Sequence, residues 1–246
     1  MATSKPQVAL ITGASRGIGA VIARRFARDG FAVAINYATN KVEADALAAE
    51  LTRDNASAIA VRADVSKADD VRHMFDIVEQ KFGRIDVLVN NAGILQAMPL
   101  AQTSDELFEK TFAINTQGVF NTLREASSRM TDGGRIINLS STVLALNLPG
   151  YAIYSGSKAA VEMFTRIFAK ELRGRHITVN AVAPGPVATE LFFNGKTEEQ
   201  IQTFTKMPPL ERLGQPDDIA GVVAFLASEN GSWINGQVIR ANGGVA

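Results

Sequence analysis

The sequence predicts an α/β fold, in which a doubly wound parallel sheet of about seven strands carries helices on both faces. Two observations lead to this class. Short apolar runs alternate with amphipathic stretches from one end of the chain to the other, and no repeat, low-complexity tract or linker interrupts them. Strands that are apolar throughout are typical of parallel sheets that helices bury on both faces. The length of 246 residues suits one such domain, so we expect a single domain over residues 1–246.

The first half of the chain shows the alternation most clearly. Short apolar strands are expected over residues 8–11, 31–35, 58–61 and 87–89. Amphipathic helices are expected over residues 17–28, 41–53 and 67–81. The pairs Asp29-Gly30 and Phe82-Gly83 follow the first and third of these helices, and a glycine in that place is a common helix stop.

The second half continues the same pattern up to a long irregular segment. The expected elements are helical material over 105–129, a strand over 135–139, a helix over 154–173, a strand over 178–182, a helix over 216–228 and a strand over 237–240. Residues 184–216 lack a clear strand or helix rhythm and contain Pro, Gly and several apolar residues. Loops of that length usually serve a function. We therefore expect a substrate lid over about residues 186–215.

Composition excludes several classes of function. Lys plus Arg and Asp plus Glu number 25 each, so no net field favours nucleic acid or an anionic membrane. The chain has no cysteine, which excludes disulfides and a cysteine nucleophile, and its two histidines argue against a metal site. Residues 1–7 show no export signal, and the longest apolar runs are far shorter than a membrane span. We expect a cytoplasmic protein that binds no metal, nucleic acid or membrane.

A glycine-rich segment, TGASRGIG at residues 12–19, lies between the first strand and the first helix. Glycines there allow a tight turn and let a pyrophosphate approach the free N–H groups of a helix N-terminus. The spacing is Gly-x-x-x-Gly-x-Gly. With this loop the sequence resembles the short-chain dehydrogenase/reductase family, in its compact single-domain branch. The resemblance implies a Rossmann-like dinucleotide-binding fold, and it extends over about residues 8–244.

The end of the second strand bears on the choice of cofactor. A carboxylate there would accept hydrogen bonds from the adenosine ribose and repel a 2′-phosphate. Residues 34–38 read AINYA, with no acid before Glu43, and Arg16 in the loop can pair with a phosphate. Both features resemble the NADP-preferring members of the family, so we expect NADP(H) as the cofactor.

Further motifs extend the expected cofactor site. The resemblance implies that Asp64-Val65 contacts adenine. It also implies that NNAG at 90–93 has a role that is partly structural and partly to line the nicotinamide ribose. The Pro-Gly turn after the sixth strand is expected to place Val187 and Thr189 near the nicotinamide and pyrophosphate. The expected cofactor-binding residues are Gly13, Ser15, Arg16, Gly17, Ile18, Gly19, Asn36, Tyr37, Ala38, Asp64, Val65, Asn91, Ala92, Gly93, Tyr154, Lys158, Pro184, Gly185, Val187 and Thr189.

Two residues at the start of the long helix suggest proton transfer. Tyr154 and Lys158 are spaced i to i+4, so they share one helix face. The pKa of a free tyrosine is about 10, which is too high for an efficient acid or base at neutral pH. An ammonium beside the tyrosine, together with the positive nicotinamide ring of the oxidised complex, is expected to lower that pKa. Ser141 follows the fifth strand, at the sheet edge where α/β proteins bind ligands.

The resemblance implies a role for each of these residues. Tyr154 donates the proton to a carbonyl oxygen, Lys158 tunes Tyr154 and holds the nicotinamide ribose, and Ser141 orients and polarises the carbonyl. Ser140 is the neighbouring alternative, but the spacing to Tyr154 matches the family at Ser141. Asn115 matches the asparagine that holds a water linked to the lysine. A buried amide bonded to the backbone is the alternative role for Asn115.

The expected reaction is the NADPH-dependent reduction of a ketone or 3-oxoacyl compound to an alcohol. Apolar residues in the lid and in the loop after the catalytic serine favour an apolar small-molecule substrate, and they are equally consistent with sealing the lid or a subunit interface. These residues are Val143, Leu144, Leu146, Leu148, Leu191, Phe192, Phe193, Phe204, Met207 and Leu210.

Other functions and the assembly state stay open at this level. An NADP-linked dehydrogenase of a sugar or polyol would need a polar lid, and a non-catalytic NADP-binding sensor would commonly lack the tyrosine or the lysine. A serine hydrolase would need a suitable histidine and a Gly-x-Ser-x-Gly elbow, which the chain lacks. The resemblance implies a homotetramer joined through the long helices and the last strand. Candidate interface or core residues are Phe164, Phe168, Trp233 and Ile234.

Overall fold

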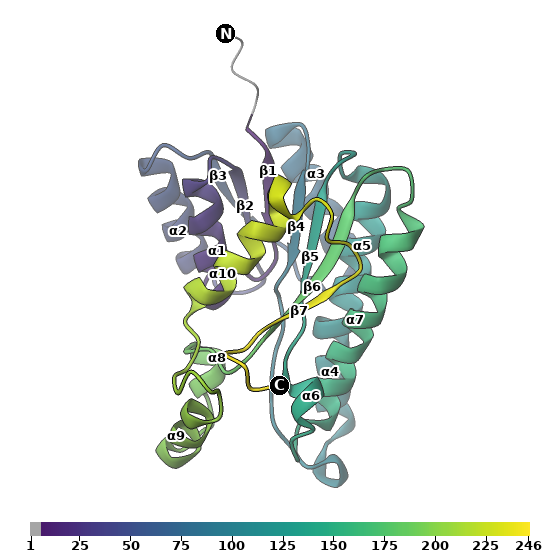
Figure 1. Ribbon diagram of the computed structural model, residues 1–246. Coiled ribbons are helices and arrows are strands. Elements are labelled where there is room, and N and C mark those ends of the chain that lie inside the picture. The colour runs from purple at the N-terminus through teal and green to yellow at the C-terminus, as the bar shows by residue number, and fades with distance from the viewer. Residues whose placement is uncertain (1–5) are drawn as a thin grey trace.

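The computed structural model describes residues 6–246, which are built around one parallel sheet. The strands are β1 (Val8–Ile11), β2 (Ala32–Tyr37), β3 (Ala58–Arg62), β4 (Val87–Asn90), β5 (Arg135–Leu139), β6 (Thr178–Pro184) and β7 (Val238–Ala241). Their order is β3-β2-β1-β4-β5-β6-β7, and all neighbours pair in parallel. The chain starts in the middle of the sheet, winds to one edge at β3, and returns to fill the other half (Figure 1). This confirms the doubly wound α/β fold that the sequence predicts.

Helices cover both faces of the sheet (Figure 1). The helices that pack on the sheet are α1 (Gly17–Arg28), α2 (Lys41–Arg53), α3 (Ala68–Phe82), α5 (Gly118–Arg129), α7 (Ala152–Glu171) and α10 (Pro216–Ala227). Side chains of α1, α2 and α10 share one apolar core with the sheet, and side chains of α3, α5 and α7 share a second. Phe26 and Phe75 are completely buried in the first and second core. Each such side chain contributes about 1.5–3 kcal/mol of stability through burial.

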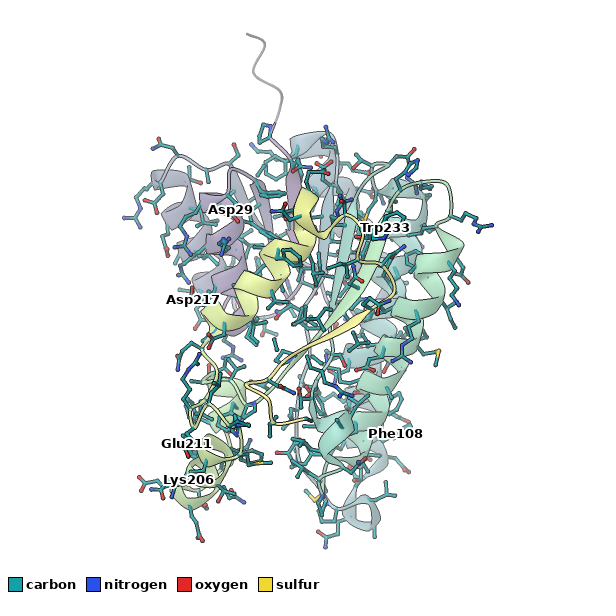
Figure 2. The ribbon with its side chains drawn as sticks, viewed as in Figure 1. Asp29, Phe108, Lys206, Glu211, Asp217 and Trp233 are labelled. Atoms are coloured by element: carbon teal, nitrogen blue, oxygen red, sulfur yellow. The ribbon has the colours of Figure 1, made fainter. Side chains whose placement is uncertain are left out.

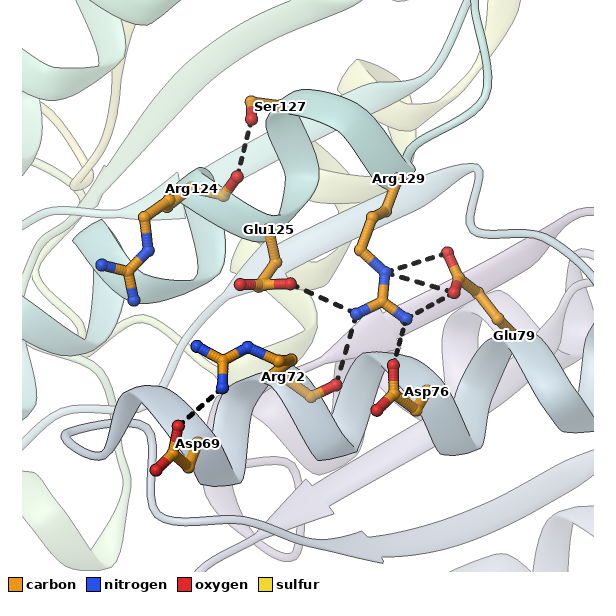
Figure 3. Close-up of polar contacts among 8 residues, drawn as sticks. All are labelled: Asp69, Arg72, Asp76, Glu79, Arg124, Glu125, Ser127 and Arg129. Carbon is orange, nitrogen blue, oxygen red and sulfur yellow. Dashed lines mark hydrogen bonds and ion pairs between the residues drawn. The ribbon is translucent and has the colours of Figure 1, made fainter.

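An ion-pair cluster joins α3 to the end of α5. The Arg129 guanidinium donates to Asp76 at 2.6 Å and to Glu125 at 3.2 Å, and it pairs closely with Glu79 (Figure 3). Its carbon centre also lies 5.4 Å from the ring centroid of Phe75. Hydrogen bonding to Glu79, followed by the other carboxylates, raises the pKa of Arg129. Because Arg129 is largely buried while it bonds to several carboxylates, this cluster fixes α5 against α3.

A chain of buried amides fixes α7 on the sheet. Asn90 Nδ2 donates to Asn138 Oδ1 at 2.8 Å, and Asn138 Nδ2 donates to Thr165 Oγ1 at 2.8 Å. All three side chains are at most 2% exposed. Buried polar groups are costly unless they are paired, so this series of hydrogen bonds specifies one position of α7 relative to β4 and β5. The same helix carries Tyr154 and Lys158.

The segment between β6 and α10 differs from the sequence prediction. Where an irregular lid is expected, the structure has two short helices, α8 (Glu190–Phe193) and α9 (Glu198–Lys206). Thr197 and Gln200 form a reciprocal capping box that starts α9. Around the carboxyl edge the chain also forms α4 (Asp105–Phe112), a π-helical turn (Ala113–Gln117), α6 (Val143–Leu146) and a 3-10 turn at Leu100–Gln102. A second 3-10 turn, Glu229–Gly231, follows α10 beside the amino end of β5, where Glu229 pairs with Arg135. The prediction of a lid without regular structure is therefore wrong in this detail.

Figure 1 places α8 and α9 beside the carboxyl ends of the strands, with α6 across from them. Within residues 6–246, no helix combines the length and the apolar character needed to cross a membrane. Residues 1–5 lie outside the described residues, and most of the segment in which the sequence predicts no export signal falls there.

Candidate active site

A cavity opens at the carboxyl edge of the sheet. It encloses about 980 Å³, open space at its mouth included, and its walls come from the loops after β4, β5 and β6, from α7 and from the two lid helices. Ser141, Tyr154 and Lys158 all line it. Segments that are distant in sequence therefore meet at the edge where doubly wound sheets bind ligands.

The catalytic candidates are buried and close to one another. Tyr154 and Ser141 are each 9% exposed and Lys158 is 4% exposed. The Lys158 ammonium donates to the backbone carbonyl of Leu139 at 2.7 Å, which anchors the side chain at the end of β5. The sequence predicts that Tyr154 and Lys158 share one helix face, and both side chains border the same cavity.

Burial shifts the pKa of both titratable groups. Desolvation raises the pKa of Tyr154 to about 12; hydrogen bonding to Ser141 opposes the rise, and the charge on Tyr151 adds to it. Desolvation lowers the pKa of Lys158 to about 8. In the protein without cofactor the pKa of Tyr154 is thus raised, because burial outweighs the hydrogen bond to Ser141. Tyr154 is therefore protonated at neutral pH, which is the form that donates a proton. The lower pKa that the sequence predicts for Tyr154 beside Lys158 and the oxidised nicotinamide stays a prediction for the complex.

The structure separates the two neighbouring serines. Ser140 Oγ donates to Glu162 Oε1 at 2.7 Å, so this hydroxyl is engaged with α7. Ser141 Oγ accepts only a long contact of 3.4 Å from the backbone N–H of Val143, and it lies near enough to Tyr154 to lower the pKa of that side chain. Ser141 is therefore the serine available to a ligand in the cavity.

Asn115 lies in the π-helical turn and is completely buried. Its Oδ1 accepts from the N–H of Ile94 at 2.8 Å, and its Nδ2 donates to the carbonyl of Ile94 at 2.9 Å and to Ser157 Oγ at 3.1 Å. A Cβ added at Gly93 would lie 3.2 Å from Asn115 Oδ1 and 3.5 Å from Lys158 Nζ. The side chain thus takes the backbone-bonded role that the sequence left as an alternative, and it borders the same small space as the lysine.

The glycine-rich loop packs too closely for larger residues. A Cβ at Gly13 would lie 2.8 Å from Ala92 Cα, and a Cβ at Gly19 would lie 2.5 Å from Asn91 Nδ2. Asn91 Nδ2 donates to the carbonyls of Thr12 and Gly13, at 2.9 Å each. The amide of Asn91 therefore ties the loop after β1 to the loop after β4.

The start of α1 fits an anionic group. Gly17 has a φ of +58°, and an added Cβ there would meet only Thr189 Cγ2, at 3.9 Å. No side chain caps this helix at its N-cap residue, Arg16, and no acidic residue lies in its first turn. A helix N-terminus with uncapped N–H groups and an open approach is a suitable site for a pyrophosphate.

The predicted cofactor residues divide into three groups. Those that line the cavity are Ile18, Asn91, Gly93, Tyr154, Lys158, Pro184, Gly185, Val187 and Thr189. Those that form the glycine-rich loop or its support are Gly13, Ser15, Arg16, Gly17, Gly19 and Ala92. Those that lie at the ends of β2 and β3, apart from the cavity lining, are Asn36, Tyr37, Ala38, Asp64 and Val65.

Asn36 supports the loop with its side chain. Asn36 is 1% exposed; its Oδ1 accepts from the N–H of Gly13 at 3.1 Å and its Nδ2 donates to the carbonyl of Ala63 at 3.0 Å. The side chain of Asp64 is also engaged, since its Oδ1 accepts from both the N–H and the hydroxyl of Ser66. The side chain of Asn36 therefore supports the glycine-rich loop and that of Asp64 supports the turn after β3, and Ala38 is the exposed member of the set.

Arg16 makes an unexpected contact with the lid. Its guanidinium lies 2.8 Å from Glu190 Oε2, at the first residue of α8, and both side chains are mostly exposed. Sequence reasoning also missed Tyr151, Lys196 and Val245, which line the cavity. Tyr151 lies three residues before Tyr154, a spacing that helical periodicity could have revealed. Lys196 has no such signal, because its position depends on how the lid folds.

Comparison with known proteins gives the family. A family model described as enoyl-(acyl carrier protein) reductase matches residues 13–246. A short-chain type dehydrogenase/reductase of Picea abies is 48% identical, over 97% of this chain and 92% of its own. A protein of Arabidopsis thaliana named NADPH-dependent aldehyde reductase-like protein, chloroplastic, is 43% identical, over 97% of this chain and 93% of its own.

Solved structures agree with these relatives. A putative dehydrogenase from Burkholderia cenocepacia with bound NADP superposes with a TM-score of 0.95 at 33% identity, over 98% of this chain and 94% of its own. The fold and the site define a Rossmann-type oxidoreductase. The chain belongs to the short-chain dehydrogenase/reductase family, which confirms the resemblance seen in the sequence.

Proposed function

We propose that the protein uses NADPH to reduce the carbonyl group of an aldehyde, ketone or 3-oxoacyl compound to an alcohol. The convergence of Ser141, Tyr154 and Lys158 in one cavity, beside a loop suited to a dinucleotide, carries the proposal. NADP(H) is the cofactor, as the sequence predicts. Arg16 lies at the start of α1, β2 ends without an acid, and the Arabidopsis and Burkholderia relatives are named for NADPH or NADP.

Each side chain has a separate task in the reaction. NADPH supplies the hydride that adds to the carbonyl carbon. Ser141 donates a hydrogen bond to the carbonyl oxygen and holds it against Tyr154, which transfers its proton to that oxygen as negative charge develops. Lys158 stabilises the phenolate left on Tyr154, and Asn115 holds the loop after β4 beside Lys158. A positioned general acid of this kind contributes roughly 10²–10⁴-fold to the rate.

The cavity wall favours an apolar substrate. We propose that the segment over about residues 186–215, with α8 and α9, closes over the substrate as a lid. Apolar side chains predominate along the wall, and those contributed by the lid and the loop after β5 include Val143, Leu146, Leu191, Phe192 and Met207. Such a surface binds the hydrocarbon part of a carbonyl compound better than it binds a sugar, whose hydroxyls need hydrogen-bond partners.

The proposal is tested by following NADPH and NADH oxidation with a panel of apolar aldehydes, ketones, 3-oxo esters and 3-oxoacyl thioesters. NADP⁺ reduction by sugars and polyols is measured in parallel. We expect turnover of carbonyls with NADPH preferred. Activity confined to sugars or polyols with NADP⁺ would overturn the proposal. As a matched pair, Ser141→Ala should lose roughly 10²-fold in rate, and Ser140→Ala should lose far less.

We propose in addition that the protein assembles as a homotetramer through two apolar surfaces. Phe120, Met163 and Ile167 are 46–50% exposed on α5 and α7. Near the edge strand β7, Phe225 is 44% exposed and Trp233 is 98% exposed. Of the other predicted interface residues, Phe164, Phe168 and Ile234 pack against the cores instead.

The assembly is tested by light scattering together with tryptophan fluorescence. Trp233, labelled in Figure 2, is the only tryptophan of the chain, so its emission reports on one surface. We expect a tetramer at high concentration and a red shift of the emission on dilution, as the indole becomes exposed to water. A monomer at all concentrations contradicts the assembly and leaves the catalytic proposal intact.

A further inference from the structure

Lys196 lies between the two lid helices and lines two adjoining cavities. One is the catalytic cavity, and the other is lined by Tyr151 and Phe204 together with polar side chains of Gln96 and Gln200. Tyr151 and Phe204 border both cavities as well. The ammonium of Lys196 therefore belongs to the boundary between the reacting end of the site and a more polar compartment.

The lid holds this ammonium in place. Nζ donates to the backbone carbonyl of Phe192 at 2.6 Å, near the end of α8. It also lies 4.7 Å from the ring centroid of Phe192 and 5.9 Å from that of Phe204, and the two rings meet edge to face at 5.6 Å. A lysine ammonium has three N–H donors, and the described residues accept one of them. The remaining donors are available to a ligand.

Charge in the catalytic cavity has one sign. Lys158 and Lys196 are the only charged residues among the described residues that line it, and neither Asp nor Glu does so. Lys158 lies at the reacting end on α7, and Lys196 lies on the lid. A cation in a wall that is otherwise mostly apolar attracts an anionic substituent strongly, because the local dielectric constant is low.

We propose that Lys196 binds a carboxylate of the substrate, and that the preferred substrates are oxo acids in which apolar chain separates the carboxylate from the reacting carbonyl. This inference rests on the proposed function of the site. A single lysine with neighbouring amides suits a carboxylate, whereas a phosphate is usually held by arginine or by several backbone N–H groups. A charge-assisted hydrogen bond in such a site is stronger than one between neutral groups.

The experiment compares straight-chain oxo acids, from acetoacetate through levulinate to longer chains, each with its methyl ester. For the wild type with NADPH, kcat/KM should favour the acid over its ester by roughly tenfold or more at the matching chain length. Lys196→Met should remove that preference and Lys196→Arg should retain part of it. The control is Lys206→Met on the exposed face of α9, which should keep the full preference (Figure 2).

Inhibition of ester reduction gives a second readout. Hexanoate should compete with the ester far better than hexanol does in the wild type, and equally poorly in Lys196→Met. Turnover of esters without any preference for acids, or a preference that survives in Lys196→Met, overturns this inference alone. If neither acids nor esters of any length are reduced while other aldehydes or ketones are, this inference alone fails. If no carbonyl compound of the panel is reduced although NADPH binds, the proposed function fails, and this inference fails with it.

Discussion

Replacing Lys158 with methionine should make the protein more stable and, by the proposed mechanism, nearly inactive. The side chain is 4% exposed, and burial lowers its pKa from 10.5 to about 8. At neutral pH the buried ammonium therefore costs about 3 kcal/mol of folding free energy, since one pKa unit corresponds to about 1.4 kcal/mol. The hydrogen bond to Leu139, at 2.7 Å, contributes about 1 kcal/mol in the opposite direction. The variant should gain about 2 kcal/mol in the free energy of unfolding.

The effect has a definite dependence on pH. The pKa of Lys158 is lower in the folded protein than in the unfolded chain, so between about pH 8 and pH 10.5 the unfolded chain binds more protons. The wild type therefore gains stability from this group as the pH rises through that window. The advantage of Lys158→Met should be largest below about pH 8 and should shrink toward pH 10.5.

Urea and thermal unfolding of the wild type and Lys158→Met at several pH values measure this difference. A gain of about 2 kcal/mol corresponds to a rise in Tm of roughly 4–8 °C for a chain of this size. Lys206→Met, at an exposed position on α9, should change stability by less than about 0.5 kcal/mol. A Lys158→Met variant that is less stable than the wild type at neutral pH, or whose advantage does not vary with pH, refutes the reasoning.

Three further predictions follow from particular contacts. Glu190→Gln frees Arg16 from an exposed ion pair. The dissociation constant of NADPH should therefore fall roughly twofold to fivefold relative to that of NADH. An equal change in the two dissociation constants contradicts this. Gly13→Ala places a Cβ against the backbone of Ala92 at a residue whose φ is +60°, so both NADPH binding and the free energy of unfolding should fall. The control, Gly221→Ala, adds a Cβ in open space within α10 and should stabilise the protein by about 0.5–1 kcal/mol. Asn138→Ala removes two buried hydrogen bonds and leaves the Asn90 Nδ2 donor unpaired, while Thr165 keeps its bond to the carbonyl of Val161, so the change should cost about 2–4 kcal/mol in urea unfolding. A cost below about 1 kcal/mol would show that the amide chain is dispensable.

The sheet could be predicted from sequence because its strands are buried on both faces. A run such as residues 8–11 has no polar position, and helices with one apolar face separate the runs. The order of the strands comes from the structure, because the apolar runs predict the strands but not which of them are neighbours. The lid helices were missed although α9 carries a visible signal, the capping box of Thr197 and Gln200 followed by a short amphipathic stretch.

The site could be predicted as far as spacing determines it. The separation of Tyr154 and Lys158 fixes their common face in any helix, and the structure brings both into the cavity with Ser141. Their pKa values could not be predicted, because the direction of each shift depends on burial, and burial depends on how α7 packs against the sheet. The contacts of Arg16 and Lys196 depend on the fold of the lid for the same reason.

The most direct test of the central claim compares the wild type with Tyr154→Phe, which removes one hydroxyl from the buried site. NADPH binding is measured by fluorescence of the reduced nicotinamide, and turnover is measured by the loss of its absorbance with the best carbonyl substrate. The proposed mechanism predicts that Tyr154→Phe still binds NADPH, with a dissociation constant that rises only a few-fold through loss of the expected cofactor contact, and that kcat falls roughly 10²–10⁴-fold. A variant that binds NADPH and still reduces the carbonyl at the wild-type rate would contradict the assignment of Tyr154 as the proton donor.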